Sequence, residues 1–154
     1  MLYVVTVIVI VSLLKQTNAL PCSGPQISVC DCEDTKVYCY GRNLTTLPSN
    51  IPITTTDLYL SNTYISTLAE DAFADLVSLD SIVLSNNALS SLPVELFSRN
   101  INLKSINLDS NSLSNIPSEL FSSNIKLLAI SVANNALGSL PGELFSFNTN
   151  LEFM

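Results

Sequence analysis

The chain has 154 residues and 47% apolar content, which excludes a disordered protein and predicts one domain around a buried core. With 13 acidic and 6 basic residues the net charge is −7, so we expect no binding to nucleic acid or to anionic lipid. The absence of histidine removes the commonest general base, histidine-activated nucleophiles and histidine-ligated metals. We therefore expect neither an enzyme nor a cofactor.

Residues 1–19 have the pattern of a secretory signal peptide. An apolar run from Leu2 to Leu14 is too short to span a bilayer comfortably, and polar residues then lead to the small residue Ala19. Because no Lys or Arg precedes the run, an uncleaved anchor is the alternative. No second apolar stretch of spanning length follows, so removal of the leader predicts a secreted, extracellular product without a membrane span.

The four cysteines cluster in residues 20–54, which we interpret as a cysteine-rich N-terminal cap. They follow the pattern Cys22-x7-Cys30-x-Cys32-x6-Cys39. An even number of clustered cysteines in an exported chain predicts two disulfides, and three pairings are open. A zinc site with four thiolate ligands is the alternative, although zinc modules usually pair cysteines two to four residues apart.

From Leu79 onward the sequence repeats every 24 residues. The aligned columns are Leu79, Leu103, Leu127 and Leu151; Ile82, Ile106 and Ile130; Leu84, Leu108 and Val132; Asn87, Asn111 and Asn135; Leu89, Leu113 and Leu137; and Phe97, Phe121 and Phe145. The preceding block keeps the register with weaker matches. We divide the array 55–154 into repeats 55–78, 79–102, 103–126 and 127–150, with a partial fifth repeat at 151–154.

Each repeat predicts one short strand. Apolar residues two apart around a variable position bury one face of a strand, here near 57–61, 81–85, 105–109 and 129–133. A repeat can bury its leucines only against its neighbours. The strands are therefore expected to stack into a parallel sheet while the chain curves.

Three polar or aromatic columns have predicted roles. The asparagine after each strand should satisfy backbone groups of its own and the adjacent loop, and Thr63, which replaces it in the first repeat, reaches less far. The phenylalanines should form a stacked spine. A second asparagine column stands where the first repeat has Leu76: Asn100, Asn124 and Asn148. We interpret it as loop-bonding amides, with Ile101 and Ile125 taking over the burial, or as ordinary turn residues.

Two surface features complete the pattern. Asn43-Leu44-Thr45 is the only N-x-S/T triplet with a permitted middle residue, and the register places Asn43 on an outward turn, so it is a candidate glycosylation site. An acidic column supplies one carboxylate per repeat without companion ligands: Glu95, Glu119 and Glu143. We expect a solvated face there and no metal site.

The pattern L-x-x-L-x-L-x-x-N-x-L-x-x-L-P resembles the leucine-rich-repeat superfamily over residues 34–154. The cysteine cluster resembles the N-terminal cap of its extracellular members, and the junction at 47–52 is similar to those of variable lymphocyte receptors and of Toll-like and Slit-like ectodomains. The resemblance implies disulfides Cys22–Cys32 and Cys30–Cys39. It also implies an α/β-type solenoid, a right-handed curved superhelix with a concave parallel sheet and mostly irregular or short helical turns on the convex face.

The resemblance further implies a recognition module that binds a protein or glycan on the concave face, as part of a longer receptor. Side chains between the buried leucines point into that face. The candidate binding residues are Asp57, Tyr59, Asn62, Val83, Asn86, Asn107, Asp109, Ser131 and Asn134. A structural matrix protein of the small leucine-rich-proteoglycan kind is the alternative. The partial fifth repeat leaves apolar residues uncovered, so self-association through it is expected of the 154-residue product.

Overall fold

The computed structural model describes residues 30–49 and 51–154. The signal peptide expected at 1–19 and Cys22 lie outside this part of the chain. The six strands found there are β1 (Asp31–Glu33), β2 (Lys36–Tyr38), β3 (Asp57–Tyr59), β4 (Ser81–Val83), β5 (Ser105–Asn107) and β6 (Ala129–Ser131). No helix occurs in the described residues, so the turns outside the sheet are irregular. This part of the chain therefore also has no helix long and apolar enough to cross a membrane.

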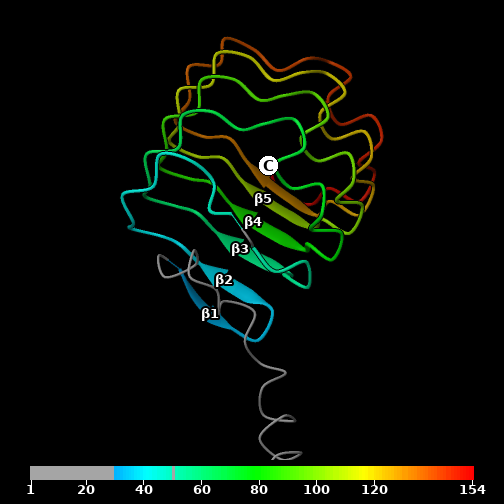
Figure 1. Cartoon of the computed structure of the whole chain (residues 1–154). Coiled ribbons are helices and arrows are strands. Elements are labelled where there is room, and N and C mark those ends of the chain that lie inside the picture. Colours follow the sequence, from blue (N-terminus) through cyan, green and yellow to red (C-terminus); the bar gives the residue numbers. More distant parts are fainter. Residues whose placement is uncertain (1–29, 50) are drawn as a thin grey trace, which may run out of the picture.

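The strands form one sheet in chain order, and the loops coil away from it on the other side (Figure 1). From β2 onward every pair is parallel, and the register advances by one repeat at each step, as from Leu58 to Ile82 to Ile106. The central residue of each repeat strand is buried and its two neighbours are half-buried. The predicted solenoid with a parallel sheet on its concave face is confirmed.

The cap adds an antiparallel hairpin to the start of this sheet. Strand β1 pairs with β2, and Asp34 in the connecting turn has φ +53°. A disulfide joins the buried Cys30 and Cys39, which is the pairing that the resemblance implies for these two residues. Cys32 is also disulfide-bonded. The Cys30–Cys39 disulfide therefore closes the hairpin at the residues just outside its two strands, and β2 of this hairpin pairs with the first repeat.

The phenylalanine column forms the expected spine. Successive ring centroids from Phe73 through Phe97 and Phe121 to Phe145 are 5.8, 6.2 and 5.8 Å apart, with interplanar angles of 5°, 19° and 7°. These angles correspond to parallel, offset stacking. The first three rings are fully buried, so the spine fixes the spacing of the repeats on the convex side.

The asparagine after each strand links neighbouring repeats, as predicted. The amide nitrogen of Asn111 donates to the carbonyl oxygens of Leu84 (2.9 Å) and Leu108 (3.0 Å), and its oxygen accepts from the Leu89 N–H (3.1 Å). Asn87 and Asn135 repeat this pattern. In the first repeat the Thr63 hydroxyl lies within hydrogen-bonding reach of the Leu60 carbonyl oxygen and the Asn87 side-chain oxygen.

The second asparagine column also bonds the loops. The amide nitrogen of Asn124 donates to the carbonyl oxygens of Phe97 (3.1 Å) and Asn100 (2.9 Å), and the side chain is fully buried. The burial expected for Ile101 and Ile125 was wrong, since they are 54% and 56% exposed. In each repeat only one of these two adjacent residues is buried. The asparagine occupies the buried position, as Leu76 does in the first repeat, so the side chain of the following residue points to solvent.

The last four residues extend the sheet by a single bridge. Phe153 pairs in parallel with Ala129, and the Ile130 N–H donates to the Phe153 carbonyl oxygen at 3.0 Å. The side chains of Phe153 and Met154 are exposed. Self-association through this edge stays a prediction.

Candidate functional site

The outward residues of the strands form two rows across the concave face. One row runs Tyr38, Tyr59, Val83, Asn107, Ser131, and the other runs Lys36, Asp57, Ser81, Ser105, Ala129. Each member is the register partner of the next, so side chains far apart in sequence become neighbours. The structure thus brings five of the nine predicted binding residues into these two rows.

A tyrosine cluster of Tyr38, Tyr40 and Tyr59 stands at the cap end of the face. Tyr38 stacks on Tyr59 with ring centroids 4.9 Å apart and an interplanar angle of 10°, and Tyr40 meets Tyr38 edge-on at 6.2 Å. Tyr40 is 58% exposed. Only Tyr59 was predicted, because the face was counted from Asp57 onward. The alternation around Val37 and Cys39, both buried, was the available signal for the other two rings.

Charged groups surround the tyrosine cluster. In the β1–β2 register Asp31 lies opposite Tyr38 and Glu33 opposite Lys36, so both carboxylates share the face of the rings. Arg42 forms an ion pair with Asp31 at 2.8 Å. The face from β1 to β6 has the acids Asp31, Glu33, Asp57 and Asp109 against Lys36 and Arg42, giving 2 − 4 = −2.

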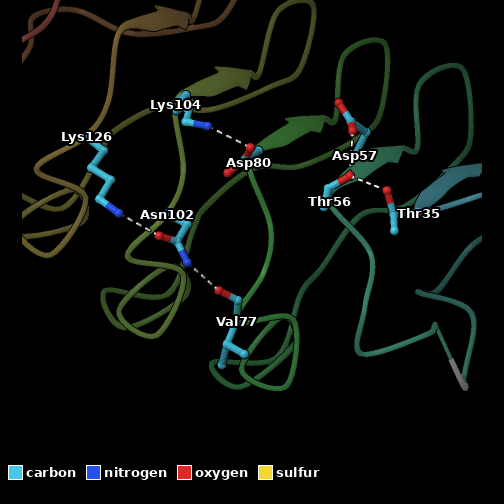
Figure 2. Close-up of polar contacts among 8 residues, drawn as sticks. All are labelled: Thr35, Thr56, Asp57, Val77, Asp80, Asn102, Lys104 and Lys126. Atoms are coloured by element: carbon cyan, nitrogen blue, oxygen red, sulfur yellow. Dashed lines mark hydrogen bonds and ion pairs between the residues drawn. The ribbon is translucent and has the colours of Figure 1, made fainter.

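Asp57 is held by a chain of hydroxyl groups at the edge where the strands begin (Figure 2). The Thr56 hydroxyl donates to the Asp57 carboxylate at 2.8 Å, and Thr35 and Thr56 share a hydrogen bond of 2.8 Å. The same edge has the Lys104–Asp80 ion pair at 2.7 Å, one repeat apart. These contacts fix the direction of Asp57 beside Tyr59.

Asp109 and its neighbours are engaged within the scaffold. The Asp109 carboxylate accepts from the Ser131 hydroxyl (2.6 Å) and from the Ala133 N–H (2.7 Å). The side-chain oxygen of Asn107 accepts from the Asp109 N–H at 2.9 Å. These three predicted binding residues therefore stiffen the face between β5 and β6 and offer a partner only their remaining hydrogen-bonding groups.

The remaining predicted residues occupy tight turns directly after the strands. The backbone has φ of +54° at Asn62, +55° at Asn86 and +54° at Asn134, and Ser110 occupies the same column at +54°. Asparagine adopts this left-handed region more readily than most residues. The turn geometry therefore accounts for these asparagines without a binding partner, although all three side chains are exposed.

The other predicted features lie apart from this face. Asn43 is exposed in the segment that follows the cap hairpin, and its glycosylation stays a prediction. Within residues 30–49 and 51–154, no group of three or more His, Cys, Asp or Glu side chains could hold a metal ion.

Comparison with solved structures places the fold among extracellular repeat proteins. Human 5T4 (Wnt-activated inhibitory factor 1, trophoblast glycoprotein) aligns with a TM-score of 0.63 and 26% identity, over 71% of this chain and 41% of that one. A chain of the octameric complex of Latrophilin 3, Unc5D and FLRT2 (LRR) aligns with a TM-score of 0.70 and 26% identity, over 82% of this chain and 39% of that one.

Two sequence relatives match short parts of the chain. The peroxidasin homolog pxn-2 of Caenorhabditis elegans is 44% identical over 52 residues, covering 34% of this chain and 4% of the relative. The acid labile subunit of the insulin-like growth factor-binding protein complex from Mus musculus is 41% identical over 64 residues, covering 37% of this chain and 11% of the relative. The chain thus spans about a tenth or less of these relatives.

The family models match most of the chain. The model described as a BspA type leucine-rich repeat region matches residues 45–154 in six copies, and the leucine-rich repeat N-terminal domain matches residues 28–52. The chain therefore belongs to the leucine-rich-repeat family, and its array begins with a leucine-rich-repeat N-terminal domain.

Proposed function

We propose that the protein is a non-catalytic extracellular recognition module that binds a protein partner on its concave face. The observation that carries this proposal is the tyrosine cluster at one end of two rows of short polar side chains. Tyrosine is enriched among the residues that dominate interface energies, because its ring gives a large contact area and its hydroxyl tolerates water. Short Ser, Asn and Ala side chains beside it let a partner approach the sheet.

The comparisons support an assembly role. One similar structure is a complex of Latrophilin 3, Unc5D and FLRT2, and one relative is a subunit of a growth-factor-binding complex. The Cys30–Cys39 disulfide fits an oxidising compartment, in agreement with a signal peptide at 1–19 and a cap at 20–54. The exposed Asn43 would carry a glycan there.

A binding assay with matched surface variants tests the proposal. The chain is screened against a panel of secreted and cell-surface proteins, and each hit is measured again with two double variants. The first, Tyr40→Ser with Tyr59→Ser, removes two rings of the cluster. The second, Ile101→Ser with Ile125→Ser, removes two exposed apolar side chains away from the concave face.

We expect the tyrosine pair to weaken binding by at least about tenfold, since anchor residues contribute about 2 kcal/mol or more, and the isoleucine pair to leave it unchanged. The opposite ranking would reject the concave face as the binding surface. Broad, low-affinity and salt-tolerant association that neither pair changes would favour the structural matrix function instead.

A further inference from the structure

The tyrosine stack ends abruptly at β4. Tyr38 covers the face of Tyr59 that looks toward β2. On the other side, the register partner of Tyr59 is Val83, followed by Asn107 on β5. In the described part of the chain no second ring contacts Tyr59. Tyr59 is half-buried. Because a valine is much shorter than a tyrosine, we expect the outer part of the second face of Tyr59 to extend above Val83.

The charges beside this ring are unbalanced. Asp57 is two residues before Tyr59 on the same face, and one oxygen of its carboxylate accepts from the Thr56 hydroxyl. Lys36 is the nearest cation in the register, but it lies between two carboxylates, with Glu33 opposite on β1 and Asp57 on β3. The following positions in Asp57's row are Ser81, Ser105 and Ala129, which have no charge. An added cation would therefore be favoured beside Asp57.

We infer that the open face of Tyr59 binds an arginine side chain of the protein partner, above Val83 and beside the Asp57 carboxylate. This inference rests on the proposed function, because it names the group that the concave face recognises. The guanidinium group is planar, weakly hydrated and positively charged, so it can continue the Tyr38–Tyr59 stack and also satisfy the carboxylate. An aromatic ring would stack but gain nothing from Asp57, and the strongly hydrated ammonium of lysine would stack less well.

Small probes of matched shape separate these contributions. N-acetyl-arginine amide, N-acetyl-lysine amide and N-acetyl-citrulline amide are titrated at constant ionic strength while the tyrosine ring signals are followed by NMR. Citrulline keeps the planar shape of arginine without its charge. Tyr64, which is 63% exposed and outside the cluster, is the internal control. We expect a saturable shift of Tyr59 with arginine, about fivefold weaker binding of lysine, and no saturable shift with citrulline or at Tyr64.

Three variants test the position of the site. Val83→Tyr fills the place of the guanidinium and should abolish the arginine shift, with the circular dichroism spectrum checking that the fold is kept. Asp57→Asn should weaken arginine about fivefold. Glu119→Gln removes the same charge from an exposed position on the convex side and should change nothing. Equal shifts with citrulline, or an arginine shift retained in both Val83→Tyr and Asp57→Asn, would overturn the inference. If the arginine probe causes no saturable shift of Tyr59, the inference is wrong. If the Tyr40→Ser, Tyr59→Ser pair nevertheless weakens partner binding, the proposed function stands without the inference.

Discussion

The two asparagine columns of the solenoid use the same side chain in different ways. After each strand, the amide of Asn111 donates to two carbonyl groups and its oxygen accepts a backbone N–H. In the convex turns, the amide of Asn124 also donates twice, but its oxygen is buried without a hydrogen-bonding partner. Asn100 and Asn148 share this feature. In the column after the strands both the side-chain nitrogen and the side-chain oxygen form hydrogen bonds, whereas in the convex column only the nitrogen does.

The backbone groups around the two columns explain what each contributes. The Leu89 N–H donates to the Asn111 side chain in place of a backbone carbonyl. In contrast, the two carbonyl oxygens that Asn124 bonds also accept from the backbone N–H groups of Asn100 (3.0 Å) and Leu103 (3.1 Å). The strand column therefore holds a backbone donor that would otherwise be buried and unpaired, whereas the convex column adds second bonds to groups already paired.

Replacement of Asn111 by alanine should give the largest effect. It leaves the Leu89 N–H unpaired in the core and removes the bonds to Leu84 and Leu108, so the free energy of unfolding should fall by about 3 kcal/mol. Urea denaturation followed by circular dichroism measures the change. Asn115→Ala, at an exposed asparagine of the same repeat, is the control and should cost much less. A loss below about 1 kcal/mol would show that the backbone finds other partners.

Replacement of Asn124 by leucine should cost less, at about 1 kcal/mol. The carbonyl groups keep their backbone partners, and the buried oxygen without a partner disappears, which offsets part of the loss. Leu76 already fills this place in the first repeat. Asn124→Ala should cost more than the leucine variant because it adds a cavity. If Asn124→Leu were as damaging as Asn111→Ala, the two columns would be energetically equivalent.

The period of the sequence was sufficient to predict the strands and the spine, because each column has one environment repeated along the solenoid. It was not sufficient for the cap. Strands β1 and β2 are three residues each and lie outside the 24-residue period, so the repeat pattern could not indicate the hairpin. The alternation of Val37 and Cys39 with tyrosines indicates only a short strand and not its partner. The Tyr38–Tyr59 stack depends on how that hairpin joins the array. This is why two of the three tyrosines were missed.

Side-chain competition explains the other differences. Apolar composition predicts Ile101 inside, but the interior place beside it is taken by Asn100, whose amide bonds two carbonyl groups. The sequence predicts Asp109 as a free residue of the concave face, but its carboxylate accepts hydrogen bonds from Ser131 and Ala133 of the next repeat. The burial of Asn100 instead of Ile101 and the bonds of Asp109 to the next repeat both depend on side-chain positions in three dimensions, which a column of aligned residues does not contain.

The smallest predicted effect concerns a third asparagine column, Asn62, Asn86 and Asn134, whose members occupy turns with positive φ. Asn86 has φ +55°, and Ser110 shows that serine can occupy the same turn at φ +54°. Asn86→Ser should therefore lower the free energy of unfolding by only about 0.5–1 kcal/mol, because serine adopts the left-handed region less readily. Asn86→Gly should restore most of the loss, since glycine has no Cβ to clash. Urea denaturation compares both with Asn115→Ser, an exposed asparagine without a positive φ. If glycine and serine were equally damaging, the Asn86 side chain itself, and not the turn, would be what stabilises the repeat.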